Sequence, residues 1–219
     1  LLDIAKQQGR IVLTGDGVDV AKALDENKAT PYIFESMALG DGKDGDEGAL
    51  VIMRTEEPQG ETVLFKPAAQ GLGHGHFDKL TWQLYDKGSE IVTDYGAARF
   101  LNVEAKFGGR YLPENNSYAK QTVAHNTVVV DEQSHFSFNL EKANANAPTL
   151  HFFENNEFGV VARASIDSTY DDVVLDRTIA LLSLPTLNKR IVVDVFDVSS
   201  DKPHTYDLPL HYSGHLIDT

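Results

Sequence analysis

The chain contains no cysteine in its 219 residues. This absence excludes disulfide bridges, a thiolate nucleophile and a zinc finger built on cysteine. Long hydrophobic runs are missing as well, since no apolar segment reaches the roughly 18 residues that a membrane span requires. No repeat at the fixed spacing of a propeller or solenoid is found either. The fold must therefore come from an ordinary packed core, which a chain of this length can supply.

Basic residues are scarce relative to acidic ones. Nineteen lysines and arginines stand against thirty-three aspartates and glutamates, which leaves a formal charge of −14. An acidic surface argues against nucleic acid as a partner, because phosphate backbones are bound through lysine and arginine. The same charge would repel an acidic polysaccharide at long range, although a few well-placed cations decide local affinity.

A period-two alternation of apolar and polar residues dominates the sequence from residue 49 onward. Such segments, bounded by Gly, Pro, Asn or Asp, are typical of β-strands. They fall at residues 49–54, 62–65, 81–85, 90–96, 159–166, 172–182 and 190–198. Because no long helix separates them, they predict a mainly β fold, an antiparallel β-sandwich.

The first 48 residues have a different composition. Residues 1–9 and 18–28 are helical in composition, and a turn separates them. A short helical segment is therefore expected over residues 1–38. Residues 39–48 are rich in glycine and acid but lack the ligand spacing of an EF-hand calcium loop, so we interpret them as a linker.

The most unusual chemistry lies in residues 73–80, with the sequence GHGHFDKL. His74 and His76 are spaced i and i+2, which would place both side chains on one face of an extended strand. The glycines between them suggest a bulge or the close approach of another group. Taken alone, an isolated pair of surface histidines needs no function.

Two residues farther along the chain extend this pattern to a possible metal site. A turn at residues 86–88 predicts a hairpin, which would fold Asp94 back beside the histidines. His125 opens another strand-like run. His76, Asp94 and His125 could then form a cluster of two imidazoles and one carboxylate, which suits zinc, with a harder divalent ion as the alternative.

Four motifs in a fixed order carry a resemblance to a known family. They are GHGHFDKL at 73–80, TDYG at 93–96, RY at 110–111 in a glycine-rich loop, and AHNTVVVD at 124–131. In this order they resemble the heparinase II/III-like polysaccharide lyases, and most closely the oligoalginate lyases of that group. The resemblance extends over roughly residues 45–219. It implies that residues 1–38 end a helical (α/α) toroid or connect from it, and that residues 49–219 form the sandwich domain, truncated at its C-terminus.

The resemblance also implies roles for single residues. Tyr111 falls on the catalytic tyrosine of the family and His74 on its active-site histidine. Arg99, near Asp94, is a candidate for binding an acid group of the substrate with both guanidinium arms. The zinc held by the His76 cluster is expected to be one ion with a mainly structural role.

The implied reaction is β-elimination at a uronic acid, with alginate as the first expected substrate. A base removes the C5 proton, the C6 carboxylate takes up charge, and the oxygen on C4 leaves, so the product carries a 4,5-unsaturated uronate end. Hydrolysis would need two carboxylates flanking the bond, for which Asp78, Asp94 and Glu114 are available. A third alternative is a non-catalytic carbohydrate-binding or structural β-sandwich with a structural zinc site.

Partners and location follow from the same resemblance. An acidic polysaccharide or oligosaccharide is the expected partner, a homodimer is left open, and the expected location is periplasmic or secreted, with a signal that is not in this chain. The family's active site lies in a cleft between toroid and sandwich. The 219-residue chain alone is therefore expected to have little activity.

Overall fold

A computed structural model describes residues 17–28, 33–55, 60–71, 74–96, 112–187 and 189–215. The chain divides into two compact units, residues 1–35 and residues 36–219. The first unit contains helix α2 (Gly17–Asp25), whose first turn carries Asp19, a charge that favours the helix N-terminus. None of the described helices is long and apolar enough to cross a membrane.

A five-stranded antiparallel sheet begins the second unit. Its strands follow one another in chain order and are β1 (Met37–Gly40), β2 (Ala49–Arg54), β3 (Thr62–Lys66), β4 (Thr81–Asp86) and β5 (Ser89–Val92). Burial alternates along β2, where Val51 and Met53 face the core and Ile52 faces outward. This alternation is the physical basis of the period-two pattern in the sequence.

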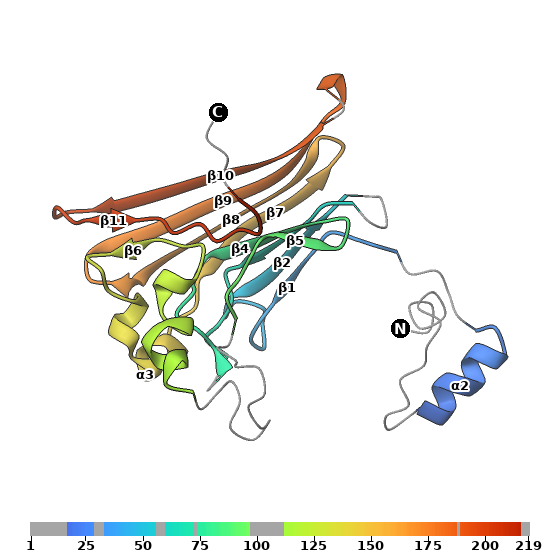
Figure 1. Ribbon diagram of the computed structural model, residues 1–219, viewed down its shortest axis with the longest axis horizontal. Coiled ribbons are helices and arrows are strands. Elements are labelled where there is room, and N and C mark those ends of the chain that lie inside the picture. The colour runs from blue at the N-terminus through green and yellow to red at the C-terminus, as the bar shows by residue number, and fades with distance from the viewer. Residues whose placement is uncertain are drawn as a thin grey trace. The chain divides into compact units, whose positions relative to one another are not determined.

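A four-stranded antiparallel sheet packs over the first one (Figure 1). In spatial order its strands are β10 (Lys189–Ser200), β9 (Val173–Leu184), β8 (Gly159–Tyr170) and β7 (Thr149–Asn156). The core between the sheets includes Phe65, Leu175 and Ile179, all fully buried. The predicted mainly β, antiparallel sandwich is therefore confirmed.

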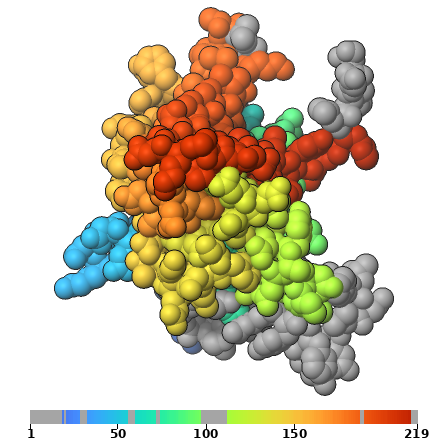
Figure 2. All heavy atoms as spheres, turned by 90° about the vertical axis from the view of Figure 1, so that its left-hand side faces the viewer, coloured from blue at the N-terminus to red at the C-terminus, as the bar shows by residue number. Residues whose placement is uncertain are grey.

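Short elements close one end of the sandwich. Strand β6 (Val129–Val130) pairs with β11 (Tyr206–Asp207), and Figure 2 shows the C-terminal segment, in red, crossing this face beside the yellow-green segment that carries β6. The helical turns here are a π-helix at Asn115–Ala119, 3-10 helices at Thr122–Ala124 and His135–Phe138, and α3 (Leu140–Asn144). A further 3-10 turn, Pro185–Leu187, joins β9 to β10.

The sheet starts earlier in the chain than residue 49. Strand β1 pairs with β2 from Met37 opposite Ile52 to Gly40 opposite Ala49, so residues 41–48 connect two neighbouring strands. Glycine-rich acidic composition is the same for a linker and for a hairpin loop, and only the pairing distinguishes them. The assignment of residues 1–38 to a helical toroid stays a prediction.

His135 provides a buried titratable group whose effect on stability can be measured. Its Nδ1 accepts a hydrogen bond from the Lys79 amide, and its Nε2 lies 3.2 Å from the Val128 carbonyl. Burial lowers the pKa of His135 from its ordinary 6.5 to about 3. Between those values the unfolded chain binds a proton that the folded protein does not, so stability should fall as the pH drops through this window.

We expect the loss to approach about 1.4 kcal/mol of unfolding free energy per pH unit. Urea denaturation between pH 7 and pH 4 measures it, with His135→Gln as the variant that lacks the titrating ring. The variant should be less stable at pH 7 and lose less stability on acidification. Parallel curves for the two proteins would show that His135 does not titrate in this way.

Candidate active site and metal centre

The segment with the two histidines is not a strand. Residues 74–80 contain a bend at Phe77 and a turn at Lys79 and Leu80 but no strand before β4 begins, so the prediction of one extended segment is wrong. Gly75 explains the departure, because a Cβ there would lie 1.3 Å from the carbonyl oxygen of Gln70. The chain folds back on itself at a point where only glycine fits.

His125 also lies outside a strand. It follows the 3-10 helix Thr122–Ala124, and the strand-like run predicted to open at His125 reduces to β6 at Val129–Val130. The ring of His125 is fully buried. The apolar residues around it resemble a strand in composition, but they pack as an irregular connection.

Asn126 holds this connection in place through its side chain. Its Nδ2 donates to the carbonyls of Trp82 and Thr93, at 3.0 and 2.8 Å, and its Oδ1 accepts from the amide of His211. The residue is fully buried. Three chain segments are thus tied to the position next to His125.

Arg177 of β9 holds the connection that contains Asn126 and the loop that ends at Leu80. Its Nη1 donates to the carbonyls of Leu80 and Asn126, while Nε and Nη2 bind the carboxylate of Asp194 on β10. The guanidinium also lies over the ring of Phe196, 4.4 Å from the centroid. A buried arginine of this kind connects the four-stranded sheet to both loops of the candidate site.

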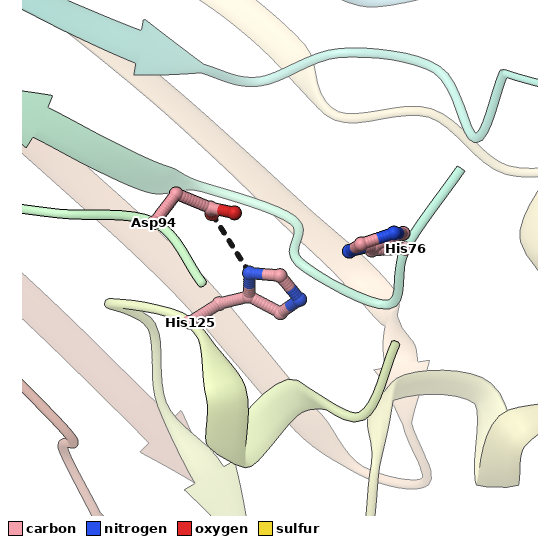
Figure 3. A group of neighbouring side chains, drawn as sticks. All are labelled: His76, Asp94 and His125. Atoms are coloured by element: carbon pink, nitrogen blue, oxygen red, sulfur yellow. Dashed lines mark hydrogen bonds and ion pairs between the residues drawn. The ribbon is translucent and has the colours of Figure 1, made fainter. Parts of the chain in front are cut away.

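Three predicted metal ligands come together here. His76, Asp94 and His125 offer ligand atoms that all lie within 4.8 Å of one another. Figure 3 shows the His125 ring beside both Asp94 and His76. Its Nδ1 lies 2.8 Å from Oδ2 of Asp94. The hairpin of β4 and β5 delivers Asp94 as expected, because Lys87 and Gly88 both have positive φ and make its tight turn.

The electrostatics of the cluster suit a divalent cation. Burial and the neighbouring His125 lower the pKa of His76, so its imidazole is neutral at physiological pH, as a metal ligand must be. Burial opposes ionisation of Asp94, but the hydrogen bond from His125, the charge of that imidazole and the Gly96 amide together lower the pKa of the carboxyl. Nε2 of His125 is buried and has no hydrogen-bond partner among the described residues, which fits an atom intended for a ligand.

A cavity of about 310 Å³ adjoins the cluster. His74, His76 and Asp94 line it together with Lys66 and Gln83. The structure therefore places the proposed catalytic histidine and two of the metal candidates around one space. Such a concave site with a few converging polar groups is typical of ligand binding.

Lys66 and Asp78 were missed as a pair by the reasoning from sequence. Lys66 Nζ forms an ion pair with Oδ2 of Asp78, whose side chain is almost fully buried. Burial would raise the pKa of Asp78, but Lys66, together with the neighbouring His125 and Lys79, overcomes this effect and the value falls to about 2. The alternating pattern of β3 places Lys66 on the same face as Leu64, away from the buried Val63 and Phe65, but it does not identify Asp78 as the partner.

The remaining residues predicted from the sequence are those for catalysis, substrate binding and hydrolysis. Tyr111 and Arg99 lie outside the described residues, so their predicted roles stay predictions. Of the carboxylates considered for hydrolysis, Asp78 is paired with Lys66 and Asp94 with His125. Glu114 is exposed beside the π-helix. Asp78 and Asp94 both line the cavity described above, but each is already engaged by a basic side chain.

An antiparallel sandwich with an imidazole and carboxylate cluster beside an open cavity has the kinds of groups that could hold a metal ion or a small polar ligand. The family described as Heparinase II/III-like, C-terminal, matches residues 37–217. The chain therefore belongs to this family of polysaccharide lyases, and the resemblance noted in the sequence is confirmed.

Two relatives match the whole chain. The exo-oligoalginate lyase of Saccharophagus degradans is 54% identical over 219 residues, and the alginate lyase of Stenotrophomonas maltophilia is 52% identical over the same length. The chain spans 30% of the length of each.

Solved structures agree on the fold. A heparinase III gene product superposes with a TM-score of 0.63 at 14% identity, covering 90% of this chain and 28% of its own. Heparan sulfate lyase from Pedobacter heparinus gives a TM-score of 0.54 at 17% identity, covering 88% and 26%. At these identities the likeness concerns the arrangement of the strands alone.

Proposed function

We propose that this chain supplies one wall of the active site of a lyase that cleaves acidic polysaccharide or oligosaccharide at a uronic acid by β-elimination, with alginate as the substrate. The observation that carries the proposal is the cavity in which His74 and Lys66 lie beside the His76 cluster. The names of the two relatives favour alginate over other uronates.

The cavity residues match the demands of this reaction. Removing the C5 proton places negative charge on the C6 carboxylate, so cations and donors must already be oriented toward it. Among the described residues lining the cavity, Lys66 is the one lysine or arginine, and Asp78 holds it in position. Burial opposes the charged form, but Asp78 prevails and raises the pKa of Lys66, which keeps the ammonium charged.

Proton transfer falls to His74 and Tyr111 in this proposal. His74 is exposed in the cavity wall, where an imidazole can exchange protons or neutralise the carboxylate. Tyr111 delivers a proton to the leaving oxygen on C4. These assignments rest on the family resemblance of the two motifs.

The test uses a chimera, because the chain spans only part of its relatives. This chain replaces the matching segment of the exo-oligoalginate lyase from Saccharophagus degradans, and oligoalginate is added. A rise in ultraviolet absorbance from the C4–C5 double bond, conjugated to the carboxylate, is expected. New reducing ends without that absorbance would mean hydrolysis. If neither reducing ends nor absorbance appears, the chain is a non-catalytic sandwich.

We further propose that His76, Asp94 and His125 hold one zinc ion with a mainly structural role. The support is the convergence of the three side chains and the unpartnered Nε2 of His125. When bound, the ion would tie together the loop of residues 74–80, the end of the β4–β5 hairpin and the connection that precedes β6.

Substitution of His76 by alanine should remove this ion. Wild-type protein purified at neutral pH is expected to carry about one equivalent of zinc by mass spectrometry, and His76→Ala much less, with a lower melting temperature because binding stabilises the folded state. His151→Ala is the matched control, since His151 is exposed and contacts Ser165 on the other sheet. Metal-free wild-type protein would refute the zinc assignment.

Lys66 can be tested apart from its structural partner. Lys66→Met alone leaves the buried Asp78 carboxylate unpaired, which should cost about 2 kcal/mol of unfolding free energy after allowance for the partial exposure of Lys66. The double variant Lys66→Met, Asp78→Asn removes both charges and should recover most of that loss. In the chimera the double variant should still lower the elimination rate by about 10- to 100-fold, because the charged hydrogen bond from Lys66 to the substrate carboxylate is lost. An unchanged rate in the double variant would mean that Lys66 does not bind the C6 carboxylate of the substrate.

A further inference from the structure

A second cavity lies at the opposite end of strand β2 from the active-site cavity. It has a volume of about 220 Å³, and the residues that matter here are Arg54, Thr55, Asn155, Asn156 and Arg190, which together we call the Arg190 site. Leu50 at the start of β2 lines the active-site cavity and Arg54 at its end lines this one. Four steps along a strand separate the two positions by about 13 Å.

Cations from several hairpins meet around the Arg190 site. Arg54 is the last residue of β2 and Arg190 is the second residue of β10. An adjoining cavity of about 390 Å³ shares Arg190 and adds Lys87 and Lys189 to its lining, with Glu61 3.7 Å from the guanidinium of Arg190. In a chain with a formal charge of −14, such a concentration of lysine and arginine favours an anionic ligand.

Thr55 supplies an independent observation at the same place. The residue is only 8% exposed, and its Oγ1 has no hydrogen-bond partner among the described residues. A buried hydroxyl without a partner is unfavourable, so it usually marks a missing ligand or water. Because Thr55 lines the Arg190 site, a ligand there could satisfy that hydroxyl.

The remaining groups suit a molecule with hydroxyls as well as a carboxylate. Oδ1 of Asn156 accepts from the amide of Phe158 at 3.0 Å, which orients the side chain and directs its NH2 group to other acceptors. Asn155 adds a second amide, and Glu157 lines the cavity as an acceptor for hydroxyl groups. Guanidinium groups match carboxylates through paired hydrogen bonds.

We propose that the Arg190 site binds a uronate residue of an acidic oligosaccharide, as a binding site separate from the active-site cavity. The choice of a uronate among carboxylated molecules rests on the proposed function. A polymer held at this site is tethered on the same domain as the active-site cavity, which raises its effective concentration there.

Titration of the ¹⁵N-labelled chain with saturated oligomannuronate tests the proposal. The side-chain amide signals of Asn155 and Asn156 should shift in a saturable manner, and Arg190→Gln should weaken that binding at least tenfold. Lys202→Gln removes the same charge near Asp172 on the β8–β9 turn and should bind as the wild type does. No shift at Asn155 and Asn156, or equal affinity in Arg190→Gln, would overturn the proposal.

Thr55→Val separates a binding role from a structural one. The substitution keeps the shape and removes the unpartnered hydroxyl, so the melting temperature should stay equal or rise while oligomannuronate binding weakens several-fold. Unchanged binding would remove Thr55 from the site. Inorganic phosphate or polyglutamate displacing the oligosaccharide at equal carboxylate or phosphate concentration would show a general anion site and overturn the assignment to a saccharide.

Failure of this proposal can be told apart from failure of the proposed function. Backbone signals of residues 74–76 report binding in the active-site cavity, and those of Asn155 and Asn156 report the Arg190 site. Shifts at the Arg190 site without unsaturated product from the chimera would refute the lyase alone. Unsaturated product without those shifts would refute the Arg190 site alone.

Discussion

Replacing Tyr111 with phenylalanine is expected to lower the elimination rate by about 10²–10⁴-fold, the usual effect of removing a positioned acid or base. The substitution deletes one hydroxyl and almost no volume, so fold, zinc content and substrate binding should survive. Tyr111 lies outside the described residues, and the expectation rests on its place in the motif of residues 110–111. The measurement is the absorbance of the unsaturated product in the chimera.

Tyr206→Phe provides the control for this experiment. Tyr206 is exposed on β11, where its hydroxyl contacts Ser200, so the same chemical change there should leave the rate unaltered. An unchanged rate in Tyr111→Phe, with product still unsaturated, would retain the lyase but exclude Tyr111 from proton transfer. His74 would then be the next residue to test.

Arg177→Met should destabilise the domain by about 3–5 kcal/mol, because two buried carbonyls lose their donor, at about 1–3 kcal/mol each, and an ion pair is broken. Asp194 is partly exposed and can be hydrated, so most of this cost comes from the carbonyls of Leu80 and Asn126, which lose their donor. The lost contact with Phe196 adds to it. Urea denaturation at neutral pH gives the change in unfolding free energy.

The control for Arg177 is another arginine of the same sheet. Arg163 binds both oxygens of Asp176, but its side chain is 48% exposed, so Arg163→Met should cost no more than about 1 kcal/mol. Because Asn126 adjoins His125, Arg177→Met should also lower zinc content in the protein that remains folded. Equal costs for the two variants would mean that the buried contacts of Arg177 contribute nothing beyond a surface ion pair.

Much of the fold was available from the sequence because strand burial is a local pattern. Alternation along residues 49–54 and 62–65 predicted β2 and β3 closely, since one face of each strand meets the core. The sequence does not predict strand β1, which falls across the boundary between the expected helical segment and the expected linker, because its four residues are too few to show a period. Strand β7 was overlooked, because most of its residues are exposed on both faces.

For the candidate site, too, one part could be predicted from the sequence and another could not. His76, Asp94 and His125 were proposed as a cluster from residue type and order, and the structure brings them within ligand distance of one another. The reasons given for their positions were partly wrong, since His76 and His125 lie in irregular connections and not in strands. Ligand chemistry depends on which residues are present, and irregular loops can deliver them as well as strands can.

The sequence by itself determined the β-class, the order of most strands, and the residue types that suit a metal and a uronate. Only the tertiary structure decided that Lys66 pairs with Asp78 and that Arg177 donates to Leu80, 97 residues away in the chain. The physical reason is that strand periodicity arises from neighbouring residues. The partner of a buried polar group, by contrast, is whichever atom the folded chain brings within hydrogen-bond distance.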